Sequence, residues 1–260
     1  MLADQGMSTR RVAARMTAAG HPVSHSTIVV EAQRHGLTAR KGIKRPLITE
    51  VQKAKRLSWC RNHIDTDWKY FLFTDEAPFW QTGSVRTRYC RPGRGPQIIP
   101  SVKHPSKVHV WGGVCYFGKT GLKVMRSSET MTAERYRGVI KDYVVDSGAI
   151  LFGKHDFTLL HDGAPAHRAR ATQRWLEEHG VSETNDFPPN SPDLNIIEHI
   201  WAIMKHNLYS HTLLYNTRTL ESAVKRSWNK VELAKIRVLV ASMPRRIQAC
   251  IDAEGGTTTY

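Results

Sequence analysis

Features that mark secreted, membrane-spanning and thiolate-metal proteins are missing from this sequence. No apolar run reaches the ~18 residues that a membrane span requires. The first residues, MLADQGMSTRR, contain no apolar stretch of the kind that a secretory signal needs. Cysteine is rare and forms no C-x-x-C pair, so we expect free thiols in a reducing compartment rather than a zinc site or disulfides. The 4 cysteines are Cys60, Cys90, Cys115 and Cys250.

Acidic residues are also scarce, because 23 Asp and Glu stand against 38 Lys and Arg, giving a formal net charge of +15. Such an excess favours a polyanionic partner such as nucleic acid, although a merely basic soluble protein is the alternative. The 260 residues fit one large domain, or a small domain followed by a larger one. A hydrophobic content of 40% is enough for a packed core.

The first 45 residues predict a small helical module. Ser8 or Thr9 can cap a helix that runs to about Ala19, and Ser24 can cap a second helix that Gly36 ends. Two short helices joined by a tight turn are typical of a helix-turn-helix, although a purely structural hairpin has the same pattern. The leading end of the second helix would meet DNA bases. Its residues are Ser24, His25, Ser26 and Thr27.

A basic linker, RKGIKRP, follows this module. Such a segment can lie along phosphates or in a minor groove, and the alternatives are a solvated tether or a nuclear localisation signal. Its cationic residues are Arg40, Lys41, Lys44 and Arg45. Thr49 then begins a helix that is expected to reach about His63.

Two aspartates close short apolar runs that are typical of buried strands. Asp75 ends KYFLFTD, and Asp162 ends FTLLHD. Because the carboxyl ends of parallel strands meet at one edge of a sheet, we expect the two carboxylates to lie close together.

A glutamate in FPPNSPDLNIIEHIW is the third candidate. Ser191 can cap a helix here, and Glu198 lies beside the apolar face formed by Leu194, Ile197 and Trp201. An inward carboxylate is costly unless a cation or hydrogen bonds compensate it. Two aspartates and a glutamate form an all-oxygen set that suits Mg²⁺ or Mn²⁺.

Other roles are expected for the neighbouring polar residues. Glu76 would face the opposite side of a continuing strand from Asp75. Asp193 lies about 140° around a helix from Glu198, so a capping role is expected for it. His161 and His167 could contact substrate phosphate or simply pack, and Asn195 could support the geometry of Glu198.

These blocks resemble the catalytic blocks of the Tc/mariner superfamily of DDE transposases. The matching segments are FTDEAPFW with Asp75, HDGAPAH with Asp162 and SPDLNIIEHIW with Glu198. The resemblance continues through VHVWGGVCYFGKTGL and SMPRRIQACIDAEGG, and therefore covers nearly the whole chain. One departure is Ile196, where that family usually has proline.

The resemblance implies an α/β fold: a ribonuclease-H-like mixed sheet flanked by helices and preceded by a small helix-turn-helix module. It predicts a helix-turn-helix module at residues 1–45, a basic linker and helix at 46–66, and a DDE catalytic domain at 67–260. It further implies catalysis by two Mg²⁺ or Mn²⁺ ions, with Asp75 bridging them, Asp162 on one and Glu198 on the other.

The implied enzyme is a cut-and-paste DNA transposase. Its partners would be the inverted repeats of a transposon and target DNA, bound by a homodimer, in the nucleus of a eukaryote or otherwise in the cytoplasm or nucleoid. Two alternatives remain: a nuclease that cuts without joining, and a transposon-derived DNA-binding protein without transposition activity. The family usually carries two helix-turn-helix units and only one fits here, so weak preference for the repeat is expected.

Overall fold

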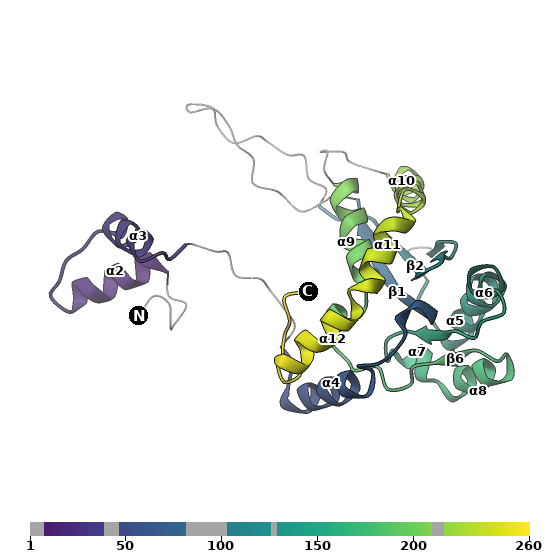
Figure 1. Ribbon diagram of the computed structural model, residues 1–260. Helices are drawn as coiled ribbons and strands as arrows, with labels where there is room; N and C mark the ends of the chain where they lie inside the picture. The colour runs from purple at the N-terminus through teal and green to yellow at the C-terminus, as the bar shows by residue number, and fades with distance from the viewer. Residues whose placement is uncertain (1–7, 39–46, 82–102, 126–128, 210–215) are drawn as a thin grey trace. The chain divides into compact units, whose positions relative to one another are not determined.

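The computed structural model describes residues 8–38, 47–81, 103–125, 129–209 and 216–260. The chain divides into two compact units, Met1–Pro46 and Leu47–Tyr260 (Figure 1). The predicted linker residues Arg40, Lys41, Lys44 and Arg45 lie outside the described residues, as does Cys90. None of the helices in the described ranges combines the length and apolar character that spanning a bilayer demands.

The first unit contains two helices, α2 (Thr9–Ala18) and α3 (His25–Arg34). Both predicted caps are present, because the side chains of Ser8 and Ser24 accept hydrogen bonds from the backbone of the first turn of each helix. Val12, Ala13 and Ile28 form the small core between the helices.

The second unit is built on a mixed sheet in the order β3-β2-β1-β5-β6, with β4 also paired to β2. The central strand β1 pairs antiparallel with β2 and parallel with β5, and β5 pairs parallel with β6. The strands are β1 (Phe71–Trp80), β2 (Lys107–Cys115), β3 (Gly118–Lys119), β4 (Lys123–Met125), β5 (Thr158–Leu160) and β6 (Ser182–Glu183).

Helices cover both faces of this sheet (Figure 1). One layer consists of α9 (Ile197–Leu208), α10 (Thr217–Asn229), α11 (Leu233–Ala241) and α12 (Met243–Asp252), with α4 (Glu50–Asn62) against α12. The other consists of α5 (Ala133–Ile140), α6 (Asp146–Phe152), α7 (Pro165–Arg168) and α8 (Arg170–Glu178). A π-helical segment, Lys141–Val145, joins α5 to α6.

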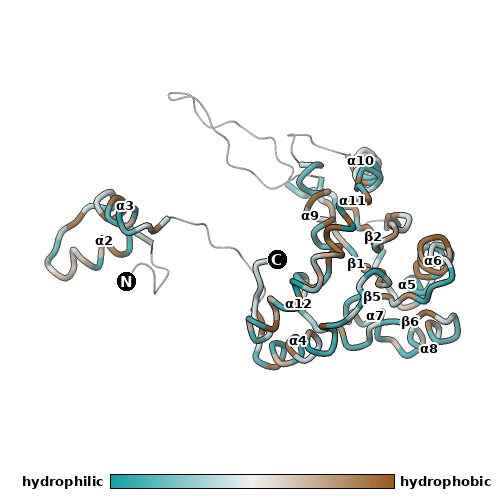
Figure 2. Tube along the Cα trace, in the orientation of Figure 1, coloured by the Kyte–Doolittle hydropathy of each residue, from teal (hydrophilic) through white to brown (hydrophobic). Residues whose placement is uncertain are grey.

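Strict alternation along β1 sends neighbouring residues into different cores. Phe73 packs with Trp201 and the α9–α12 layer, whereas Leu72 packs with Tyr136 of α5 in the opposite layer. Apolar residues are concentrated along α9 and α11, while α8 at the periphery is mostly hydrophilic (Figure 2). Cys60, Cys115 and Cys250 are buried free thiols.

Two local expectations were wrong. β1 does not end at Asp75 but continues to Trp80, because its pairing with β2 persists as far as Lys107. Ser191 makes no capping bond either, since a single 3₁₀ turn (Pro192–Leu194) intervenes and α9 begins at Ile197. Glu198 therefore lies in the first turn of its helix.

Candidate active site

Parallel pairing of β1 with β5 brings the two aspartates to corresponding positions. The last pair in the register is Phe73 with Leu160, and each strand path carries an aspartate two residues further on. Asp75 is still inside β1, opposite Gly112 of β2, whereas Asp162 lies just beyond β5 with a side chain that is 54% exposed. The predicted proximity of Asp75 and Asp162 thus follows from the register, even though only one of them closes its strand.

The carboxylate of Asp75 points into the α9 layer. Trp201 of α9 donates its indole Nε1–H to Asp75 Oδ2 over 3.3 Å. Gly112 permits this approach, because a Cβ at that position would lie 3.1 Å from the ring of Trp201 and 3.0 Å from that of Trp228. Trp201 is therefore both a core residue and a hydrogen-bond donor to the site.

Asn195 fixes the start of α9 to the same strand. Its Nδ2 donates to the carbonyl of Thr74 over 3.1 Å, and its Oδ1 accepts from the backbone N–H of Ile197 over 3.3 Å. The next residue, Glu198, lies close enough to Asp75 for the two carboxylates to shift each other's pKa. Asn195 thus ties the glutamate's helix to the residue that precedes the aspartate.

Asp75 and Glu198 are crowded by negative charge. Burial raises the pKa of Asp75 well above its usual range, and the nearby Glu198, Glu76 and Asp162 carboxylates raise it further. Burial also raises the pKa of Glu198, an effect that Lys205 opposes. The charged groups that act on Asp75 are all acidic, so a bound cation would stabilise its ionised form.

Asp162 has a different partner, His167 of α7. His167 Nδ1 lies 2.9 Å from Asp162 Oδ1, and Nε2 lies 3.5 Å from Glu76 Oε1, an ion pair rather than a hydrogen bond. Burial lowers the pKa of His167, but its bonds to Asp162 and Glu76 prevail and raise it to about 10. The hydrogen bond from His167 in turn lowers the pKa of Asp162.

His161 turns away from the carboxylates. Its Nδ1 accepts from the hydroxyl of Tyr136 over 2.6 Å, and its Nε2 lies 2.5 Å from Glu183 Oε2. The side chain is buried and stacks on His167. A packing role accounts for it fully.

The three carboxylates are only partly assembled for a metal ion. Across the described ranges, no group of three or more His, Cys, Asp or Glu side chains is placed so that it could hold one. Asp75 and Glu198 meet, while Asp162 is drawn to the His167 imidazolium. The three side chains nevertheless fit a hard divalent cation, because each offers carboxylate oxygens as ligands. The acidic neighbours of Asp75 favour a cation there as well.

A buried ion pair that the sequence did not predict lies at the 3₁₀ turn that precedes α9. Arg56 of α4 donates from Nη1 to Asp193 Oδ1 (2.9 Å) and from Nη2 to Oδ2 (2.7 Å), and both side chains are nearly inaccessible. Thr258 donates its hydroxyl to the same Oδ2, and Arg246 donates to the Asp193 carbonyl. The expected capping role of Asp193 was therefore wrong. Its partners are too distant in sequence for any local pattern to have indicated them.

This ion pair predicts a specific dependence of stability on pH. Burial raises the pKa of Asp193, but the hydrogen bonds from Arg56 outweigh it and leave that pKa below its usual value. The stabilisation is then complete above the unfolded-state pKa of about 3.9 and is lost as the pH falls through the lower folded-state value. In urea unfolding, the difference in unfolding free energy between the wild type and Asp193→Asn should be constant from about pH 5 to 8. This difference should shrink below about pH 4.

Asp65→Asn is the matched control, because Asp65 is exposed. Its unfolding free energy should track that of the wild type at every pH. If the difference in unfolding free energy between the wild type and Asp193→Asn grew as the pH fell, the stabilising role of the Arg56–Asp193 ion pair would be contradicted.

The predicted base-contacting residues form the exposed start of α3. Ser24, His25, Ser26 and Thr27 are all exposed. The hydroxyl of Ser24 is engaged within the turn, by Thr27 N–H and by the hydroxyls of Ser26 and Thr27. This leaves His25 with the freest side chain of the four, and their contact with DNA stays a prediction.

A mixed sheet with one aspartate on its central strand, a second just beyond the adjacent parallel strand and a glutamate on a later helix is typical of a ribonuclease-H-like DDE nuclease. A family model described as "DDE superfamily endonuclease" matches residues 70–221, and a transposase helix-turn-helix model matches residues 3–65. The chain belongs to the DDE superfamily of endonucleases and is a transposase of the Tc/mariner type, as the resemblance predicted.

Curated proteins with similar sequences are also transposases. The chain is 27% identical to the transposable element Tc1 transposase of Caenorhabditis elegans, over 91% of this chain and 88% of that protein. It is 28% identical to the Tcb2 transposase of Caenorhabditis briggsae, over 90% and 87%.

Solved structures confirm the predicted fold class. The Mos1 transposase paired-end complex with left transposon end matches with a TM-score of 0.84 at 17% identity, covering 99% of this chain and 77% of that one. The Mos1 catalytic domain alone matches with a TM-score of 0.65 at 16% identity, covering 83% of this chain and 99% of that one.

Proposed function

We propose that Asp75, Asp162 and Glu198 carry out cut-and-paste transposition, cleaving DNA at transposon inverted repeats and joining the freed ends to target DNA. The observation that supports this most directly is the parallel register of β1 and β5, which brings Asp75 and Asp162 to corresponding positions, with Glu198 close enough to Asp75 to act on its pKa. Both the catalytic family model and the helix-turn-helix model support the same reading.

The proposal includes divalent metal ions, two of Mg²⁺ or Mn²⁺, held by these three carboxylates. Bound there, they would stabilise charge on the attacking and leaving oxygens of the phosphodiester. The chain's own residues prepare the site. Trp201 holds one oxygen of Asp75, Asn195 holds the start of the Glu198 helix, and His167 holds Asp162. Solved Mos1 paired-end complexes are described with Mn and with Mg, which supports this choice of metal.

Double-stranded DNA is the proposed partner. The net charge of +15 supports it, and the exposed first turn of α3 would contact bases while the Arg40–Arg45 segment contacts phosphates. A homodimer is part of the proposal, since two transposon ends have to be processed together. We propose the nucleus as the site of action in a eukaryotic host.

Removal of the metal tests this function. With a duplex that carries the element's own terminal repeat, we expect strand cleavage and joining to a target plasmid in Mg²⁺, and neither in excess EDTA. Binding of the duplex, followed by gel shift, should persist in EDTA because phosphate contacts come from cationic side chains.

The products separate the alternatives. Cleavage without joined products would identify a nuclease that cuts only. Binding without any cleavage in Mg²⁺ or Mn²⁺ would identify a DNA-binding protein derived from a transposon, and would contradict the proposal.

A further inference from the structure

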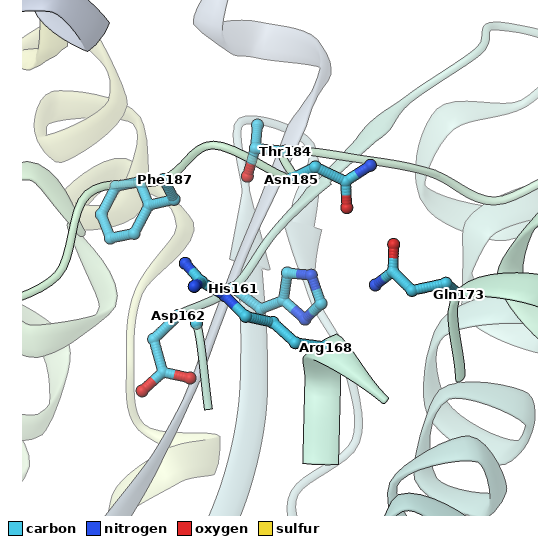
Figure 3. Close-up of a pocket in the computed structure, with 8 residues that line it drawn as sticks. His161, Asp162, Arg168, Gln173, Thr184, Asn185 and Phe187 are labelled. Atoms are coloured by element: carbon cyan, nitrogen blue, oxygen red, sulfur yellow. The ribbon is translucent and has the colours of Figure 1, made fainter. Parts of the chain in front are cut away.

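A small polar pocket adjoins the candidate site and has Asp162 in its lining. Figure 3 shows Arg168 extending along it, with its guanidinium on the same side as Asp162 and with Gln173 and Asn185 across from them. Thr184 and Phe187 complete its wall.

Arg168 is exposed, and its guanidinium lies over a glycine. It is the last residue of α7, and its guanidinium rests on the backbone of Gly163, the residue after Asp162. A Cβ at Gly163 would lie 2.6 Å from Cζ and from Nε of Arg168, closer than real contacts allow. Glycine at position 163 is therefore what lets the guanidinium lie at this spot.

The charge of Arg168 has no partner in the described part of the chain. Its side chain takes part in none of the hydrogen bonds or ion pairs found there, and Asp162, which lines the same pocket, is already bound to His167. An arginine held next to acidic residues yet not paired with them is suited to an external anion. Its planar fork matches the oxygens of a phosphate in a bidentate contact.

Amides complete an anion-binding arrangement. Gln173 donates from Nε2 to the His167 carbonyl over 2.9 Å, which fixes its side chain at the pocket wall. Asn185 is exposed and lines the same pocket. Such groups are typical donors to the oxygens of a nucleic-acid backbone.

We propose that Arg168, seated on Gly163, binds a single backbone phosphate of the DNA strand that is cut, next to the phosphodiester that meets Asp75, Asp162 and Glu198. This rests on the proposed function. Arg168 would act as a positioning residue: it sets the register of the strand relative to the carboxylates and takes no part in bond breaking.

A methylphosphonate scan tests the contact. Each phosphate near the cleavage site of the terminal-repeat duplex is neutralised in turn, and the dissociation constant is measured in EDTA so that no cutting occurs. Wild type should lose about tenfold in affinity at the phosphate that Arg168 holds, the scale of one charge-assisted contact. Arg168→Ala should bind the unmodified duplex about tenfold less tightly and be indifferent to neutralisation at that one phosphate.

Two variants separate position from charge. Gly163→Ala retains Arg168 but displaces its guanidinium, so it should reproduce the indifference at the same phosphate. Arg174→Ala is the control, because Arg174 is an exposed arginine of α8 that does not line the pocket. This variant also removes one positive charge. Its loss of affinity on neutralising each phosphate should match that of the wild type.

The outcomes of the two proposals are distinguishable. If the wild type cuts DNA in Mg²⁺ but Arg168→Ala retains the wild-type scan, the phosphate contact is wrong and the proposed function stands. If the wild type binds without cutting, the proposed function fails, and the scan in EDTA still decides whether Arg168 holds a phosphate.

Discussion

Asp75→Asn is expected to abolish DNA cleavage while making the metal-free protein more stable. The carboxylate is buried next to Glu198, with Glu76 and Asp162 nearby, so it costs folding free energy when ionised. Asparagine removes that charge and can still accept the hydrogen bond from Trp201. We expect the unfolding free energy to rise by on the order of 1 kcal/mol. We expect cleavage to fall at least about a thousandfold, equivalent to about 4 kcal/mol.

Thermal unfolding with and without Mg²⁺ shows whether Asp75→Asn loses cleavage because a metal ligand is missing or because the fold is damaged. Mg²⁺ should raise the melting temperature of the wild type, because a ligand that binds only the folded state stabilises it, and should leave Asp75→Asn almost unchanged. Asp156→Asn, at an exposed position before β5, is the control and should behave as wild type in both assays. A variant that is less stable than wild type and still responds to Mg²⁺ would rule out Asp75 as a metal ligand.

Arg56→Ala is expected to have the largest effect on stability. It would leave Asp193 buried without its two guanidinium donors and would remove the donor to the Gly255 carbonyl. Breaking a buried pair on one side costs about 3–5 kcal/mol. Urea unfolding should show this loss, whereas Arg61→Ala, at an exposed position on the same helix, should stay within about 0.5 kcal/mol of wild type.

A double variant tests whether the pair also positions the site. Arg56→Met with Asp193→Leu removes both charges, and such apolar replacement should recover much of the lost stability. Cleavage should not recover to the same extent, because the segment that leads from Asp193 to Glu198 would no longer be held by directional bonds. Full recovery of both quantities would show that the pair serves stability alone.

Local chemistry made the helix starts predictable. Ser8, Ser24 and Thr49 each begin a helix within one residue of the expected position, because capping depends on a few neighbouring groups. The parallel register of the strands that carry Asp75 and Asp162 was also predictable, since short apolar runs that end in an acid have few other arrangements in an α/β fold.

Features that depend on distant residues were not predictable. Nothing around Asp75 indicates that β1 continues past it, because that depends on pairing with β2. The contact of His167 with Glu76 joins α7 to strand β1, which no local pattern indicates. The contact of His167 with Asp162 was easier to expect, because the two residues are close in sequence. Asp193 looked like a cap because its partner, Arg56, precedes it by 137 residues.

The Arg56–Asp193–Thr258 contacts also order events during protein synthesis. All three candidate catalytic carboxylates leave the ribosome before Thr258, which follows Glu198 by about 3–12 s at ordinary translation rates. Until then Asp193 lacks the Thr258 hydroxyl, and Arg56 lacks the carbonyls of Gly255 and Gly256 that it bonds in the folded chain. A nascent chain can thus form the sheet and its aspartates early, yet completes the support of the segment that precedes Glu198 only after residues 255–258 have emerged.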